Sequence, residues 1–158
     1  MTFTSDLDLY TWMRKNIKYR HYNHKSGLMS PKAVETLKTG SCHDQVLFEL
    51  NKLQTIPDIQ GLRGWFIIES NEMGQGGMTH SVVTYTKDHS LYYFEHSWCG
   101  RQGITKIKDI EEVYQNLHKQ GIYGNIDQYP NLEIFPFVGT PGMSLHELVQ
   151  ACVNADKT

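Results

Sequence analysis

Apolar side chains recur every two to four residues in several stretches of the chain, a spacing that places them on one face of a helix. The clearest stretch follows Ser41, where an apolar stripe runs from Val46 to Leu53. Ser41 can cap the first turn, and Asp44, three residues on, can act as the reciprocal partner of that cap. Further helices are predicted over residues 6–18, from Pro31 to near Gly40, and over 109–117 and 145–153.

The pattern changes from helix to strand after Gly64. Residues 65–68 are aromatic and β-branched, as in a buried strand, and a glycine-containing loop follows them. Residues 79–86 and 91–98 then read as two strands joined by a short turn, which predicts a hairpin. A further strand is predicted over 134–138, broken by a proline. The order of elements favours an α+β fold.

Composition and charge narrow the class of protein. The 158 residues match the usual size of one domain, so we expect residues 1–158 to form a single domain. With 39% hydrophobic and 20% charged residues the chain is typical of globular proteins, and its net charge of -2 does not favour a nucleic-acid partner. We find no apolar run of roughly 18 residues and no secretion signal at the start, and therefore expect a cytoplasmic protein without a membrane span.

Three widely spaced cysteines, Cys42, Cys99 and Cys152, form no Cys-x-x-Cys pair and are treated as free thiols. Cys42 lies in the first turn of the helix capped by Ser41, where unpaired amide groups favour the thiolate over the thiol. The same amide groups can donate to an oxyanion formed when a thiolate attacks an acyl carbon. Cys42 is therefore the candidate nucleophile, whereas the other two cysteines are expected to be inert.

A thiolate nucleophile needs a base, and the base needs a partner for its second ring nitrogen. His80 opens the first strand of the predicted hairpin, directly after the glycine-containing loop. A two-residue turn at 88–89 puts Glu95 one diagonal step from His80, and a four-residue loop puts it directly opposite. A three-residue loop would bring His96 opposite His80 instead. The sequence favours Glu95 as the partner.

The order Cys42, His80, Glu95 resembles the transglutaminase-like superfamily, which shares a papain-like core. The resemblance covers residues 19–105, and its motifs read GSCHD over 40–44, MTHSVV over 78–83 and YFEHSW over 93–98. It implies an α+β fold with the nucleophile helix packed on an antiparallel sheet, and a Cys-His-Glu triad. It also implies cysteine-dependent amide hydrolysis or acyl transfer to an amine, with no cofactor.

The sequence departs from this family at two positions. His43 stands where many relatives carry an aromatic residue, and Glu95 replaces the commoner aspartate. We expect His43, His96 and Trp98 to contact the substrate, which would be a peptide, a protein or a small amide.

Two other functions, a binding module and a metal site, are also compatible with parts of the sequence. A catalytically inactive binding module of the same fold would recognise a peptide or single-stranded nucleic acid, and residues 14–25 do interleave basic and aromatic side chains. A solvated helix face running into a loop accounts equally well for that segment, and the acidic balance favours this reading. Cys42, His43, His80 and His96 would be zinc ligands if they converged, but they lack a compact spacing motif, so no metal site is predicted.

Overall fold

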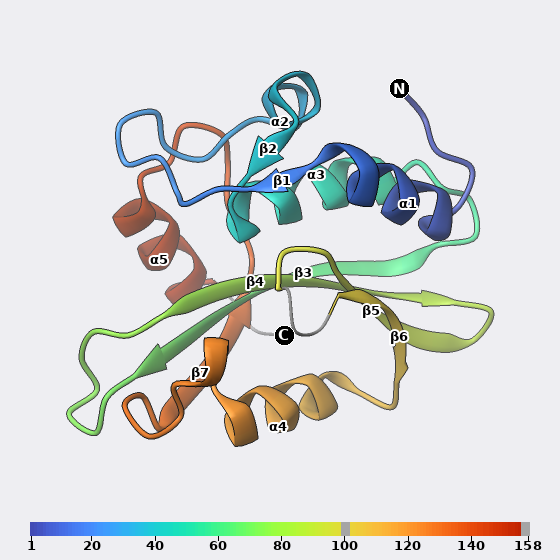
Figure 1. The fold of residues 1–158 in the computed structure, drawn as a ribbon. Helices are drawn as coiled ribbons and strands as arrows, with labels where there is room; N and C mark the ends of the chain where they lie inside the picture. Colours follow the sequence, from blue (N-terminus) through green and yellow to red (C-terminus); the bar gives the residue numbers. More distant parts are fainter. Residues whose placement is uncertain (99–101, 156–158) are drawn as a thin grey trace.

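A computed structural model describes residues 1–98 and 102–155, so the expectation for Cys99 lies outside the described residues. The described chain is a mixed α+β structure in layers (Figure 1). Its helices are α1 (Asp6–Asn16), α2 (Pro31–Leu37), α3 (Cys42–Leu53), α4 (Ile110–Gln120), α5 (Leu145–Val153) and the 3-10 helix η2 (Ile122–Gly124). Its strands are β1 (Lys18–Tyr19), β2 (Thr39–Gly40), β3 (Gln60–Ser70), β4 (Thr79–Lys87), β5 (Ser90–Glu95), β6 (Gly103–Ile107) and β7 (Asn131–Pro136).

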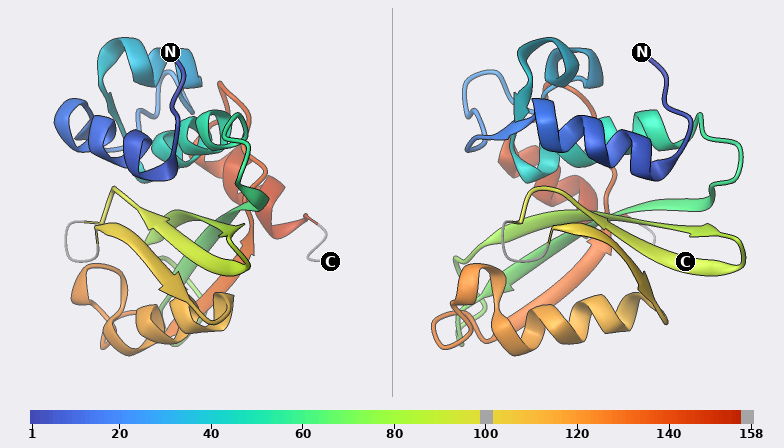
Figure 2. Two further views of the ribbon diagram at one scale, coloured as in Figure 1. Left: turned by 90° about the vertical axis from the view of Figure 1, so that its right-hand side faces the viewer. Right: turned by 45° about the vertical axis from the view of Figure 1, so that its right-hand side comes forward.

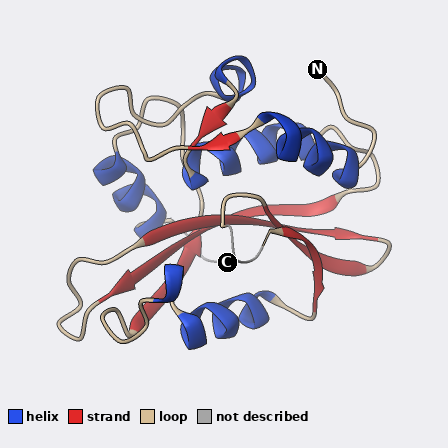
Figure 3. Ribbon diagram, viewed as in Figure 1, coloured by secondary structure: helices blue, strands red, loops and turns tan. Residues whose placement is uncertain are grey.

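The central layer is an antiparallel sheet with the strand order β6-β5-β4-β3-β7. Helices α1, α2 and α3 lie over one face and α4 lies under the other, as the turned views and the colouring by secondary structure show (Figures 2 and 3). Strands β1 and β2 form a separate parallel pair on the side of α1. Helix α3, which carries the candidate nucleophile Cys42, thus packs on the antiparallel sheet. Within the described ranges, no helix is both long and apolar enough to cross a membrane.

Local signals at the helix starts agree with the structure. Ser41 and Asp44 form the predicted capping box of α3: the Ser41 side chain accepts from the Asp44 amide, and the Asp44 carboxylate accepts from the Ser41 amide. Ser30 caps α2, which ends at Leu37 rather than near Gly40 because Lys38 adopts a left-handed conformation. The helix predicted over 6–18 ends at Asn16.

The turn between β4 and β5 has two residues, and this sets the register of the hairpin. Asp88 and His89 both have positive φ values, 51° and 62°, and Lys87 pairs with Ser90. Such turns match the right-handed twist of the flanking strands. Of the registers considered from the sequence, the structure therefore adopts the one that puts Glu95 one diagonal step from His80.

Several strand boundaries differ from the prediction. The second hairpin strand was predicted to continue to Trp98 but ends at Glu95, because Glu95 Oε2 accepts the amides of Ser97 (3.1 Å) and Trp98 (3.3 Å). The strand predicted over 134–138 is instead β7, Asn131–Pro136, at the sheet edge, where a proline is tolerated. Strand β6 was not predicted, since it is short and largely solvent-accessible.

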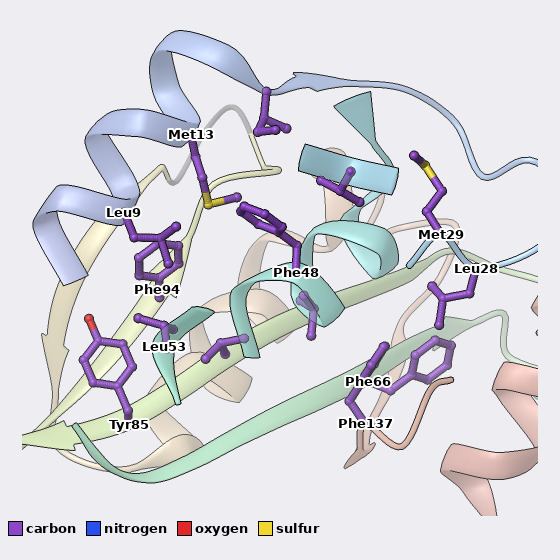
Figure 4. Close-up of a cluster of buried hydrophobic side chains, with 14 of the residues drawn as sticks. Leu9, Met13, Leu28, Met29, Phe48, Leu53, Phe66, Tyr85, Phe94 and Phe137 are labelled. Carbon is purple, nitrogen blue, oxygen red and sulfur yellow. The ribbon is translucent and has the colours of Figure 1, made fainter. Parts of the chain in front are cut away.

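Apolar side chains fill both faces of the sheet. Between the sheet and α1 and α3, Leu9, Met13, Phe48, Phe66 and Phe94 are inaccessible to solvent (Figure 4). A smaller cluster on the other face packs α4 against the sheet through Val113 and Leu117. Each fully buried apolar side chain stabilises the fold by roughly 1.5–3 kcal/mol. Both clusters therefore stabilise the packing of the helices on the sheet.

Gly77, between the loop and β4, occupies a position that only glycine fits. Its φ is +114°, and an added Cβ would lie 1.6 Å from the carbonyl oxygen of Glu69. We expect Gly77→Ala to lower the free energy of unfolding by about 2 kcal/mol, because the loop must shift to relieve the clash. Gly76→Ala is the matched control, since its φ is also positive but nothing lies within 4 Å of the added Cβ. Urea unfolding measures both; equal losses would contradict the steric argument.

Candidate active site

Cys42 is the first residue of α3, and the capping box fixes its position. The Asp44 carboxylate accepts the Ser41 amide at 2.8 Å through Oδ2 and the Met29 amide at 2.8 Å through Oδ1. The amides of Cys42 and His43, at the first two positions of the helix, have no acceptor within the helix. The Cys42 thiol is thus held beside two backbone donors and is only 3% exposed.

The short β1–β2 pair leads the chain into this helix. Tyr19 pairs with Gly40, and the Gly40 carbonyl accepts from the Gln45 side chain at 2.9 Å. A Cβ on Gly40 would lie 2.9 Å from the Asp44 Cβ, so a larger residue would disturb the capping box. This close approach explains the glycine that precedes α3.

His80 and Glu95 meet where β4 and β5 separate. The paired residues of the hairpin run from Lys87 and Ser90 to Val83 and Phe94, and His80 lies beyond the last pair. There the His80 Nε2 atom lies 2.5 Å from Glu95 Oε1, with both side chains buried. Whether Glu95 or His96 partners His80 was open from the sequence; in the structure it is Glu95.

The Glu95 carboxylate is fully engaged. Besides His80, Oε1 accepts from the Tyr93 hydroxyl at 2.8 Å, and Oε2 accepts the two amides that end β5. A carboxylate held on both oxygens cannot rotate away from the imidazole. Because it accepts from Nε2, it leaves Nδ1 as the ring nitrogen available for proton exchange.

The electrostatics of Cys42 and His80 favour a thiolate–imidazolium pair. Burial by itself would raise the pKa of the Cys42 thiol, but the charges and hydrogen bonding of His43 and His80 outweigh it and lower that pKa to about 6. Burial opposes the charge on His80, yet Glu95 and Cys42 raise the pKa of His80 to about 10. The buried Nδ1 of His80 has no other partner within the described residues, so the thiol of Cys42 is the group with which it interacts.

His43 lies next to the nucleophile but is tied to β4. Its Nδ1 lies 2.6 Å from Ser81 Oγ and its Nε2 lies 3.0 Å from Thr79 Oγ1. Its ring also packs against Phe66, with a centroid separation of 5.1 Å. The ring is therefore held rigidly at the edge of the site.

His96 and Trp98 lie elsewhere. His96 Nδ1 contacts Gln45 Oε1 at 2.7 Å, which ties it to α3. The Trp98 ring stands edge-on to His80 at 6.0 Å and borders a small cavity of about 70 Å³ beside α4. Trp98 thus packs against the imidazole and is not among the described residues lining the cavity at Cys42.

A cavity of about 530 Å³ opens beside Cys42. Ser41, His43, Thr79 and Ser97 line its inner end. Gly77 and Met78, at the end of the glycine-containing loop, also line it, and sequence reasoning missed the remaining residues of its wall. The clustered rings of residues 19–24 are visible in the sequence, but they were interpreted only as a possible nucleic-acid surface. Nothing in the sequence indicated a role for Tyr123. These additional lining residues are Tyr19, His21, Tyr22, His24, Tyr123 and Leu145.

A second buried carboxyl group, Glu49, lies two turns along α3. Burial first, and then the negative charge of Glu95, raise the pKa of Glu49 well above its ordinary value. Burial therefore favours the protonated form of Glu49, whereas the oxygens of Glu95 accept four hydrogen bonds. The two buried glutamates thus differ in their surroundings.

The described residues contain no group of three or more His, Cys, Asp or Glu side chains placed to hold a metal ion. Among known proteins, no family model and no curated protein matches the chain. The functional reading therefore rests on the geometry of the site.

Proposed function

We propose that the protein is a cysteine-dependent amide hydrolase or acyltransferase of the transglutaminase-like class, with Cys42, His80 and Glu95 as its triad. The observation that carries the proposal is the buried 2.5 Å contact between His80 Nε2 and Glu95 Oε1. This contact leaves Nδ1 of His80 available to exchange a proton with the thiol of Cys42, which lies at the start of a capped helix. The α+β architecture, with α3 packed on an antiparallel sheet, supports the same class.

In the first half-reaction the Cys42 thiolate attacks the acyl carbon of an amide. The oxyanion that forms accepts from the amides at the start of α3. The C–N bond then breaks, the His80 imidazolium gives its proton to the departing amine, and the acyl group remains on Cys42 as a thioester.

In the second half-reaction an acceptor, either water or an amine, attacks the thioester. His80, now neutral, takes the acceptor's proton, and the C–S bond breaks to restore the thiolate and imidazolium. Glu95 stabilises the charged imidazole whenever it forms and keeps its ring oriented. No step requires a metal or an organic cofactor.

The proposal is tested by trapping the acyl-enzyme. Incubation with p-nitrophenyl acetate is expected to release nitrophenol in a burst and to add one acetyl group to Cys42, detected by peptide mass spectrometry. Added amines of increasing concentration show whether the acceptor is water or an amine. Cys42→Ser is expected to abolish the burst and Cys152→Ser to leave it, because Cys152 is buried in the core. Acetylation of Cys42 no faster than that of an unactivated thiol would contradict the proposal.

A further inference from the structure

The outer wall of the cavity beside Cys42 is built mainly from rings. Residues 19–24 supply four of them on the side of β1, and Tyr22 packs edge-on against His43 at 6.0 Å. The hydroxyl of Tyr22 also donates to the Met143 carbonyl, which fixes that ring against the segment before α5. Met78 and Leu145 add apolar surface. The wall is therefore rigid and largely aromatic.

Charged side chains are missing from this wall as far as it is described. Among the described lining residues there is no lysine, arginine, aspartate or glutamate. A charged group that leaves water without a partner loses several kcal/mol of solvation. A carboxylate would in addition face the thiolate of Cys42 and the carboxylate of Glu95. The cavity thus disfavours a carboxylate most strongly, offers an ammonium group no aspartate or glutamate on its wall, and favours uncharged groups.

The size of the cavity indicates how much of a substrate it receives. Pockets of about 300–1,000 Å³ hold organic ligands of moderate size. At about 530 Å³ the cavity holds a ring-bearing side chain together with the acyl group that it carries. It therefore accommodates the part of the acyl donor next to the reacting carbonyl.

Tyr123 lines the cavity beside Tyr19, whose side chain interacts with the Tyr123 phenol. Its backbone is left-handed, with φ 58° and ψ 26°, a conformation that is costly for tyrosine. Tyr123 and Cys42 line the same cavity, and burial and then the charge of Cys42 raise the pKa of the Tyr123 phenol. Tyr123 thus borders the path to the nucleophile.

Glu69 holds the turn that carries Tyr123. The Asn125 side-chain amide donates to Glu69 Oε1 at 2.9 Å, and the Ile122 amide also bonds to this carboxyl group. Gly121 fits against the carboxyl, since a Cβ there would lie 3.0 Å from Oε2. A buried side chain of β3 therefore sets the position of the wall, and the left-handed Tyr123 is maintained by this anchoring.

From these walls we infer that the acyl donor carries an uncharged aromatic side chain beside the reacting carbonyl, with Tyr123 as a specificity-determining residue. This inference rests on the proposed function, because it assigns a substrate class to the same thiol.

The test uses electrophiles that alkylate Cys42 without needing turnover. N-benzyl chloroacetamide presents a neutral ring, chloroacetyl-glycine a carboxylate, and N-(2-aminoethyl) chloroacetamide an ammonium group; in each case the thiolate displaces chloride. Each labelling rate at Cys42 is divided by the rate of the same probe with glutathione. We expect the benzyl probe to react at least tenfold faster than either charged probe on this scale. Equal rates for the benzyl probe and a charged probe would overturn the inference.

Iodoacetamide separates this outcome from failure of the proposed function. Selective labelling of Cys42 by iodoacetamide, with no preference among the larger probes, would support Cys42 as the nucleophile but overturn the inferred substrate class. Absence of selective labelling by iodoacetamide would contradict both the proposed function and the inferred substrate class.

Two substitutions test the role of Tyr123. Tyr123→Phe keeps the ring and is expected to keep the preference for the benzyl probe. Tyr123→Asn removes the ring with a residue that tolerates left-handed backbone, and is expected to reduce the preference at least threefold. Tyr129→Asn, in the same segment but outside the described cavity wall, is the control. An unchanged preference in Tyr123→Asn would overturn the assignment of Tyr123.

Discussion

Replacing His80 by alanine is expected to move the pH at which Cys42 becomes reactive upward by at least one unit from about 6. The imidazolium, stabilised by Glu95 up to about pH 10, supplies much of the positive charge that holds the thiolate in a buried position. Without it, burial acts against the thiolate and moves its pKa toward the ordinary value of about 8.5. The measurement is the rate of iodoacetamide labelling at Cys42 from pH 5 to pH 10, followed by mass spectrometry.

The whole profile is needed because a thiolate of lower pKa is also a weaker nucleophile, which compresses rate differences at any single pH. His43→Gln is the companion variant, since His43 also contributes to the lowered pKa. His43 lies beside Cys42 but is bonded to Ser81 and Thr79, so its loss should shift the profile without removing the base. An unchanged midpoint in His80→Ala would show that His80 does not activate the thiol.

The residues of the candidate triad could be predicted because each is specified by local rules. A capping box marks the start of α3 and hence the place of Cys42, and a two-residue turn with positive φ values sets the hairpin register. Once that register is known, the diagonal from His80 to Glu95 follows. The capping box is visible in the sequence, whereas the two-residue turn was one of three turn lengths considered and is established by the structure.

The surroundings of the triad could not be predicted in the same way. His96 and Trp98 were predicted to lie on a strand that in fact ends at Glu95. The strand ends there because the Glu95 carboxylate accepts amides that would otherwise pair with the neighbouring strand. The turn that carries Tyr123 is bonded to Glu69, a contact between segments distant in sequence. Such contacts depend on tertiary packing, and the local pattern of hydrophobic residues does not predict them.

Substituting the two buried glutamates by glutamine should have opposite consequences. Glu95→Gln removes the negative charge beside His80 and presents an amide group where four donors converge. Breaking a buried ion pair costs about 3–5 kcal/mol, so we expect a loss of that order in the free energy of unfolding, together with a raised pKa for Cys42. Urea unfolding at pH 7 and the iodoacetamide profile measure the two effects.

Glu49→Gln is the matched control, because the same change is made in the same buried region. The pKa of Glu49 is raised in the folded protein, so above about pH 4.5 the unfolded chain loses this proton while the folded protein keeps it. The glutamate therefore lowers stability increasingly as the pH rises, and replacing it should remove that dependence. We expect Glu49→Gln to be within about 1 kcal/mol of the parent at pH 4 and relatively more stable at pH 7. If both variants lost stability equally at pH 7, the contrast drawn between the surroundings of Glu95 and Glu49 would be wrong.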